Sequence, residues 1–409
     1  MITGAGIGGL TLALALAKEG IASTILERAE LFSEAGAGIQ LGPNAVSVLQ
    51  DLGAGAALAP MVACPQAITI LDGPSGRPLA KLPLGDWIAR RHGAPYWVAR
   101  RADLQAALLA VVRGSSLIEI VTAFQVERFE DTGEKICVLS RDGRMARGRL
   151  LVGADGHWST LRDQVCPGGA LTFTGMSAAR ALLPAQDVPR PYREPLTRLW
   201  LAPQCHIVHY PVRAGAEIAV VVIANDPWSG RDWSATADRE VVLEKLTAFA
   251  SELREVLASA REWRKWALYD RSPLERWSRG RATLLGDAAH PILPYLAQGG
   301  AMAIEDAATL AAELAAHRSD PAGALVRYER LRRRRVARVQ SASRINGRIY
   351  HLAGPLAAAR NLVLKNLPGD RIMSRYDWLY GWKGDGGQGR ACSLGSEPAG
   401  LTPRSPSTE

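Results

Sequence analysis

The chain has 409 residues, of which 47% are hydrophobic and 22% charged, and it carries a formal net charge of +9. This length is enough for two lobes with cores of their own, and no apolar run reaches the roughly 20 residues that cross a bilayer. The five cysteines are widely scattered and form no C-x-x-C pair, so neither a zinc site nor a disulfide framework is supported. We therefore expect a cytoplasmic protein with no metal ion and no stable membrane insertion.

Much of the positive charge lies in residues 327–348, where arginines recur three and four positions apart with apolar residues between them. This spacing predicts a helix with a solvated basic face. The sequence contains no recognisable nucleic-acid module, so we do not expect nucleic acid as a partner. A basic surface would instead steer anionic small molecules toward the protein.

The first predicted element is a nucleotide-binding turn. Residues 4–9 have the G-x-G-x-x-G spacing through Gly4, Gly6 and Gly9. Glycines in this pattern permit a tight turn, close approach of the backbone to a diphosphate, and close packing of a helix on a strand. Only three residues precede Gly4, whereas a buried strand normally has about five. We therefore expect either an unusually short first strand or a start downstream of the true one.

A helix and a second strand follow this turn. The helix runs from Leu10 to about Lys18, and its start offers unpaired N–H groups and a positive dipole end to phosphates. The strand, residues 23–26, ends at Glu27, which lies 18 positions after Gly9. An acidic residue near this distance typically accepts hydrogen bonds from ribose hydroxyls. Together these features predict a bound dinucleotide.

Two further glycine-bearing segments lie at residues 153–156, which contain Asp155, and 286–291, which contain Asp287. Either segment alone also fits an ordinary hairpin or helix cap. All three glycine segments are explained together if they close around one dinucleotide. After them, residues 298–300 open an alanine-rich helix.

The predicted fold class is α/β. β-rich runs between residues 197 and 224 are separated by turn residues and predict a mixed or antiparallel sheet. We expect a Rossmann-like dinucleotide-binding domain with an inserted β-sheet substrate domain. The expected bounds are 1–60, 99–170 and 265–320 for the first domain, 61–98 and 171–264 for the second, 321–382 for C-terminal helices, and 383–409 for a disordered tail.

The order of these motifs resembles the group A FAD-dependent aromatic hydroxylases, the family of para-hydroxybenzoate hydroxylase, and within it the salicylate and 3-hydroxybenzoate hydroxylases. The resemblance covers about residues 1–345 and rests on segments 4–9, 37–44, 101–104, 153–156, 286–291, 298–300 and 305–306. It implies the fold of para-hydroxybenzoate hydroxylase, non-covalent FAD, and NADH or NADPH as a co-substrate that docks transiently.

The resemblance also implies roles for individual residues toward FAD. Glu27 would hold the adenosine ribose, and Arg101, at a helix start, would neutralise diphosphate charge. Asp287 would accept a hydrogen bond from a ribityl hydroxyl, and the helix that begins near Gly299 would direct its positive end at the flavin ring. The full set of expected cofactor-binding residues is Gly4, Gly6, Gly9, Glu27, Arg28, Gln40, Arg101, Asp155, Gly286, Asp287, Gly299 and Gly300.

In the reaction that the resemblance implies, reduced flavin takes up O2 as a C4a-hydroperoxide, which an electron-rich ring attacks. A phenol is a poor nucleophile until it is deprotonated, and histidine suits the role of base near neutral pH. Alternation along residues 205–211 places His206 and Tyr210 on one face of a strand and His209 on the other. The resemblance to 3-hydroxybenzoate hydroxylases favours His209 as the base.

Gln298 is expected to bind the carboxylate or hydroxyl of the substrate, and Tyr295 to line the same pocket. The expected substrate is a small phenolic acid such as salicylate or 3-hydroxybenzoate, and the protein is expected to be a monomer or a homodimer. Two alternatives remain. One is a hydroxylase of the same fold that acts on another ring, such as 6-hydroxynicotinate or a quinone precursor, and the other is a flavin-binding redox sensor without hydroxylase activity.

Overall fold

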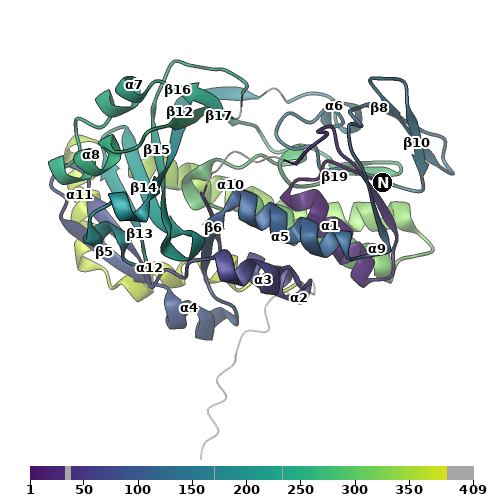
Figure 1. The fold of residues 1–409 in the computed structure, drawn as a ribbon. Helices are drawn as coiled ribbons and strands as arrows, with labels where there is room; N and C mark the ends of the chain where they lie inside the picture. Colours follow the sequence, from purple (N-terminus) through teal and green to yellow (C-terminus); the bar gives the residue numbers. More distant parts are fainter. Residues whose placement is uncertain (33–37, 170, 233, 385–409) are drawn as a thin grey trace, which may run out of the picture.

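The computed structural model describes residues 1–32, 38–169, 171–232 and 234–384. Most of the expected disordered tail, at 383–409, lies outside the described residues, as does the first residue of the 37–44 segment. Figure 1 shows two lobes, each built on its own sheet, with long helices packed between and across them. None of the helices in the described part of the chain combines the length and apolar composition that crossing a bilayer requires.

The first lobe contains a six-stranded sheet in which all neighbours are parallel except the terminal pair. Its strands, in spatial order, are β18 (Ser278–Arg279), β19 (Ala282–Leu284), β11 (Leu151–Gly153), β1 (Ile2–Thr3), β2 (Ser23–Leu26) and β7 (Ile118–Val121). The three glycine segments follow β1, β11 and β19, which are neighbours in this sheet. Because the carboxyl ends of parallel strands lie at one edge, the fold brings the three segments together there.

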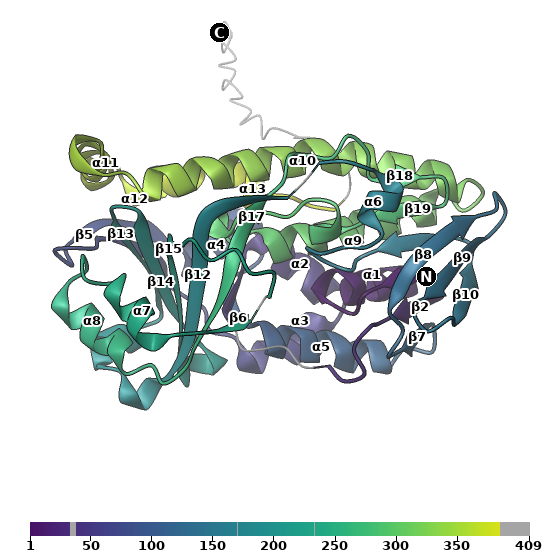
Figure 2. The same ribbon diagram turned by 90° about the horizontal axis from the view of Figure 1, so that it is seen from above.

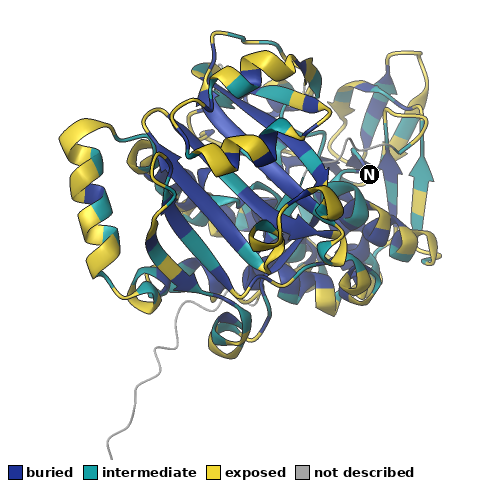
Figure 3. Ribbon diagram, turned by 60° about the vertical axis from the view of Figure 1, so that its left-hand side comes forward, coloured by how far each residue is buried: buried dark blue, intermediate teal, exposed yellow. Residues whose placement is uncertain are grey.

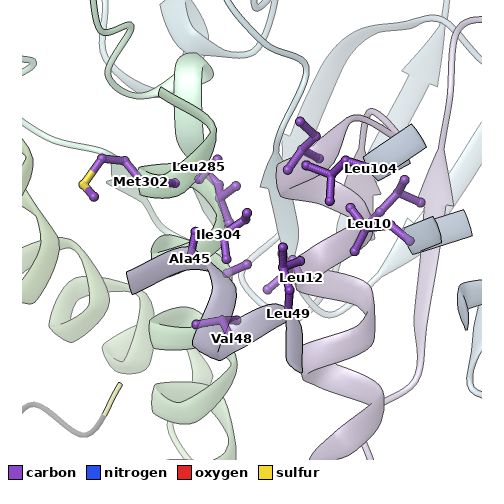
Figure 4. Packing of buried hydrophobic residues seen from close by; sticks show 14 of the residues in the cluster. Leu10, Leu12, Ala45, Val48, Leu49, Leu104, Leu285, Met302 and Ile304 are labelled. Atoms are coloured by element: carbon purple, nitrogen blue, oxygen red, sulfur yellow. The ribbon is translucent and has the colours of Figure 1, made fainter. Parts of the chain in front are cut away.

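Helices pack beside this sheet and against one another. They are α1 (Ile7–Lys18), α2 (Pro43–Asp51), α3 (Ala54–Leu58), α5 (Arg101–Arg113), α6 (Arg162–Val165) and α9 (Gly299–Ala316). Figure 4 shows side chains from α1, α2 and α9 meeting in one core, among them Leu12, Leu49 and Ile304, which are fully buried. A Cβ on Gly8 would lie 2.7 Å from the side chain of Leu285, the residue after β19. Glycine therefore allows α1 to approach the end of this strand closely.

The second lobe contains an eight-stranded mixed sheet, antiparallel except for one pair, β13 with β4. In spatial order its strands are β16 (Ala235–Ala237), β17 (Trp263–Asp270), β12 (Thr172–Pro184), β15 (Glu217–Asn225), β14 (Cys205–Val212), β13 (Leu196–Ala202), β4 (Ala67–Asp72) and β5 (Pro78–Pro83). β17 pairs with β12, so residues 265–270 belong to this sheet and not to the first domain, where the sequence placed them. Figure 3 shows the strands as mostly buried.

One face of this sheet is covered by α7 (Arg239–Glu244) and α8 (Ser251–Ala258), whose Val242 and Leu253 pack on strand residues such as Ile207. The opposite face turns toward the first lobe. Smaller elements complete the fold: the β3 (Gly38–Leu41) and β6 (Trp97–Arg100) pair, the three-stranded sheet of β8 (Val126–Asp131), β9 (Ile136–Ser140) and β10 (Met145–Gly148), and α4 (Gly85–His92).

The arginine-rich helix α10 (Pro321–Tyr350) runs the length of the molecule across both lobes, as Figure 2 shows. It is followed by α11 (Gly354–Asn366), α12 (Gly369–Ser374) and α13 (Asp377–Tyr380). The sequence predicted that the arginines of this helix form a solvated basic face, and this prediction is wrong for three of them. Arg332 is 1% exposed and pairs with two buried carboxylates of α9, while Arg335 and Arg344 form further ion pairs with α9 and β17.

Candidate active site

The first two glycine segments line a cavity of about 330 Å³ at the edge of the first sheet. Six of the expected cofactor residues line this one cavity: Gly4, Gly6, Glu27, Arg28, Arg101 and Asp155. Its size is in the range of a small-molecule site. Gln105 and Trp158 also line it, although the sequence gave no reason to select them.

Each glycine of the first segment has a different geometric role. Gly4 has a φ of +92°, and a Cβ there would lie 2.6 Å from the Ala154 carbonyl oxygen. A Cβ on Gly9 would lie 2.0 Å from the Gly4 carbonyl oxygen, so both positions exclude a side chain for reasons of fold. A Cβ on Gly6 would meet no atom within 4 Å, and this residue therefore leaves open space for a ligand beside the start of α1.

The carboxylate of Glu27 is fixed at the cavity by the backbone. Its Oε2 accepts a hydrogen bond from Ala5 N at 2.6 Å, and its Oε1 accepts one from Ala29 N at 2.8 Å. A carboxylate offers about four lone-pair sites, so both oxygens retain capacity to accept ligand hydroxyl groups.

The two carboxylate oxygens of Asp155 lie in different surroundings. Its Oδ2 accepts a hydrogen bond from Thr160 N at 2.9 Å and so caps the turn that follows β11. Its Oδ1 is buried and has no hydrogen-bond partner among the described residues. Buried acceptors are rarely left without a partner, so an unsatisfied oxygen beside the cavity suits a ligand hydroxyl.

Arg162, at the start of α6, ties two of the glycine segments together. Its side chain is 2% exposed and donates to the carbonyl oxygens of Asp287 and Ala288, both at 2.6 Å. It also donates to the carbonyls of Gly156 at 3.3 Å and His157 at 2.9 Å. One buried guanidinium therefore sets the distance between the loops that carry the two expected cofactor aspartates.

Asp287 lies beside the start of α9. A Cβ on Gly299 would have Asp287 Oδ1 as its nearest neighbour, at 3.9 Å, whereas one on Gly300 would lie 2.9 Å from Ile39. Gly286 has a φ of +60°, and its N–H donates to Asp306 Oδ2 at 3.0 Å. Asp287 lines not the first cavity but a second one, of about 80 Å³, that shares Trp158 with the first.

A buried ionic network supports Gln298, the N-cap of α9. Asn44 Nδ2 donates to Gln298 Oε1 at 3.1 Å and to Glu305 Oε1 at 2.7 Å. Glu305 in turn pairs with Arg332 and Arg335 of α10 at 2.7 and 2.6 Å. The amide oxygen of Gln298 is thus engaged, which makes its NH2 group the end available for a substrate.

Helix α10 holds the loop at 291–295, which precedes Gln298. Gln340 Nε2 donates to the Pro291 carbonyl at 2.9 Å, and Ser343 Oγ donates to the Leu293 carbonyl at 2.6 Å. One turn further on, Asn346 donates to the carbonyl of Tyr295 at 3.3 Å. Tyr295 itself is buried, with its ring against the backbone of α10.

The structure does not place His209 with Gln298 and Tyr295. His209 lies on the face of β14 that α7 and α8 cover, against the rings of Tyr192 and Trp200 at 5.5 and 6.2 Å. The sequence correctly put the two histidines on opposite faces. It selected the wrong face for the cleft because the position of the covering helices is not a local property of the strand.

His206 and Tyr210 occupy the face of β14 that turns toward the first lobe. The His206 ring lies 5.6 Å from the ring of Tyr295. The Tyr210 hydroxyl lies beside Gly38, where a Cβ would approach it to 2.5 Å. Gln40, expected among the cofactor residues, lies within hydrogen-bonding reach of Tyr210 and accepts a hydrogen bond from the Tyr96 hydroxyl at 2.8 Å.

Comparison with known proteins agrees with this architecture. A family model described as FAD binding domain matches residues 1–343, so the chain belongs to this family of FAD-binding proteins. The chain is 37% identical to 3-hydroxybenzoate 6-hydroxylase 1 of Aquipseudomonas alcaligenes, over 93% of this chain and 97% of that protein. It is also 37% identical to 3-amino-4-hydroxybenzoate 2-monooxygenase PtnB3 of Streptomyces platensis, over 93% and 95% of the two chains.

Among solved structures, Klebsiella pneumoniae HpxO complexed with FAD and uric acid superposes with a TM-score of 0.81 at 26% identity, over 91% of this chain and 94% of that one. The protein is therefore an FAD-dependent monooxygenase of the group A aromatic hydroxylases, as the resemblance implied. The residues present suit FAD, because Gly6 leaves open space at the helix start and Asp155 offers a buried, unsatisfied oxygen.

Proposed function

We propose that the protein hydroxylates a small hydroxybenzoate, with 3-hydroxybenzoate as the first candidate, using O2 and NADH or NADPH. The two relatives above are named for 3-hydroxybenzoate and 3-amino-4-hydroxybenzoate, rings that carry both a carboxylate and a hydroxyl. The observation that carries the proposal is the buried pair His206 and Tyr210, which share the face of β14 turned toward Tyr295.

His206 acts as the base that removes the phenolic proton. Bound FAD supplies the activated oxygen, and the protein binds and orients the ring and excludes water. Burial lowers the pKa of His206 well below its ordinary value, so the ring is neutral at pH 7 and able to accept a proton. In 3-hydroxybenzoate the carbon para to the ionised hydroxyl is C6, and deprotonation makes that carbon the nucleophile.

Uncharged hydrogen-bond donors recognise the carboxylate of the substrate. Burial raises the pKa of Tyr96 and of Tyr210, so both hydroxyls stay protonated and can donate hydrogen bonds. Gln298 presents its NH2 group because Asn44 holds its oxygen. In this assignment Gln298 and Tyr210 bind the carboxylate, Gln40 orients Tyr210, and Tyr295 forms an aromatic wall.

The first cavity holds the adenosine and diphosphate end of FAD. Gly6 and the start of α1 receive the diphosphate, and Arg28 and Arg101 add positive charge at the same cavity. Glu27 binds the ribose, while Asp155 and Asp287 bind ribityl or diphosphate-proximal hydroxyls through their carboxylates. NADH or NADPH docks from outside this cavity.

The test is a panel of hydroxybenzoates assayed for NAD(P)H oxidation, hydroxylated product and peroxide release. We expect 3-hydroxybenzoate to give 2,5-dihydroxybenzoate with little peroxide. Peroxide without hydroxylated product for every compound would contradict the proposal and support the redox-sensor alternative.

Two histidines of one strand provide a matched pair of variants. His206 and His209 are each 2% exposed but lie on opposite faces of β14. His206→Asn should retain FAD and lower kcat by about 10²- to 10⁴-fold, the usual contribution of a general base. His209→Asn should keep kcat near the wild-type value. If His209→Asn lost this activity and His206→Asn kept it, His209 would be the base.

A further inference from the structure

The ring of His206 is hydrogen-bonded to a second histidine. Its Nδ1 lies 2.8 Å from Nε2 of His351, the residue that caps the C-terminus of α10. His206 is buried, whereas His351 is only partly buried. We propose that His351 is a positioning residue that holds His206 in the base-competent tautomer and carries the substrate proton from the pocket to the surface. This inference rests on the proposed function.

The fold holds His351 in place from three directions. Its N–H donates to the Gly347 carbonyl at 3.3 Å, and its carbonyl accepts a hydrogen bond from Gln204 N at 3.3 Å, in the turn that leads into β14. Arg360 of α11 donates to the carbonyls of Ile349 and Tyr350 at 3.0 and 2.9 Å. The ring therefore faces His206 because α10, α11 and the β13–β14 turn meet at this point.

The hydrogen bond determines which ring nitrogen of His206 faces the substrate. Nδ1 is engaged with His351, so Nε2 is the nitrogen available to the phenolic hydroxyl. When Nδ1–H donates to His351, Nε2 has a free lone pair and can accept a proton. A histidine held in the opposite tautomer has an N–H at this position and cannot act as a base.

The surroundings of the pair disfavour a retained positive charge. Tyr295 and Tyr350 contact the His206 ring, and Tyr295 and Arg360 face His351. Among the described residues no carboxylate is hydrogen-bonded to either ring. Burial lowers the pKa of His351 to about 4, with Arg360 adding to the effect, and burial also lowers that of His206. A proton accepted by His206 must therefore move on.

The proton transfer balances without a further reactant. The substrate O–H bond breaks and its proton forms the Nε2–H bond of His206. The Nδ1 proton of His206 moves to Nε2 of His351, and His351 releases its own Nδ1 proton to water. When the phenolic product leaves, the same path operates in reverse and returns one proton to the oxygen.

The experiment compares His351→Gln, His351→Ala and a control, His317→Gln, in the FAD-loaded protein with 3-hydroxybenzoate. His317 is a suitable control because it caps the C-terminus of another helix, α9. We expect His351→Gln to bind FAD and substrate like the wild type. Its kcat should fall by about 10- to 100-fold, the effect typical of removing the outer partner of a metal-bound histidine. Added imidazole should restore several-fold activity to His351→Ala but leave His317→Gln unchanged.

Unchanged kcat in His351→Gln, or a loss in His351→Ala that imidazole does not restore, would overturn the inference. Ring ¹⁵N spectra of the wild-type protein give a readout that needs neither turnover nor a folded variant. They should show neutral rings that share one hydrogen bond between His206 Nδ1 and His351 Nε2 at pH 7, and two independent rings would also overturn it. A wild-type protein that hydroxylates no hydroxybenzoate would contradict the proposed function, while the spectra would still report on the pair.

Discussion

Replacing Arg162 with methionine tests whether one guanidinium sets the spacing of the loops around FAD. A hydrogen bond from a charged donor contributes about 1.5–3 kcal/mol. Only the two bonds at 2.6 Å, to the carbonyls of Asp287 and Ala288, are counted here. Their loss amounts to about 3–6 kcal/mol, and apolar contacts of the methionine offset part of it. We therefore expect the apo protein to lose about 3–4 kcal/mol of its free energy of unfolding.

The assay is urea denaturation of the apo protein at pH 7, followed by titration with FAD monitored by flavin fluorescence. Weaker FAD binding should accompany the loss of stability, because the loops at 155–157 and 286–288 are no longer tied together. Arg279→Met is the control, since Arg279 is exposed and donates to one carbonyl, that of Gln164; we expect it to change stability by less than about 0.5 kcal/mol. If the free energy of unfolding of Arg162→Met fell by less than about 1 kcal/mol and the variant bound FAD normally, Arg162 would not be what sets the spacing of the loops.

Three further predictions follow from the same geometry. Gly9→Ala should prevent normal folding, because its Cβ would lie 2.0 Å from a carbonyl oxygen. Gly6→Ala should have the melting temperature of the wild type but bind FAD more weakly. Thermal denaturation and FAD titration distinguish the two variants. Burial alone would raise the pKa of Asp306, but its buried histidine and arginine partners outweigh burial and lower it to about 2. This carboxylate therefore contributes its full stabilisation above about pH 4, the pKa of an aspartate in the unfolded chain, and this contribution is lost as the pH falls toward 2. In Asp306→Asn, the free energy of unfolding measured against pH should no longer show that loss. Arg335→Met should expose α13 to limited proteolysis, because Arg335 donates to the carbonyls of Trp378 and Leu379, both at 2.8 Å.

The arrangement of the glycine segments was predictable from the sequence because its signals are local. Gly4, Gly6 and Gly9 have a fixed spacing, and Asp155 and Asp287 each follow a short buried strand. Once these strands are neighbours in a parallel sheet, their carboxyl ends must meet. Local pattern and global topology therefore both place Gly4, Gly6 and Asp155 at one cavity, and Asp287 at the neighbouring one.

The substrate side was less predictable because it depends on contacts distant in sequence. Alternation separates His206 from His209 but cannot say which face α7 and α8 cover. His351 lies 145 positions after His206, and no motif marks it. Helical spacing likewise groups the arginines of α10, but it does not show that Arg332 forms ion pairs with Glu305 and Asp306 of α9.

The regular attachment of α10 to the loop at 291–295 limits how this enzyme can be reshaped. Side chains three positions apart on the helix hold alternate carbonyls of the loop, at Pro291, Leu293 and Tyr295. Inserting or deleting one residue in either partner would shift every later attachment out of phase. Variants selected to accept bulkier rings should therefore gain room through smaller side chains on β14, and not through a longer loop.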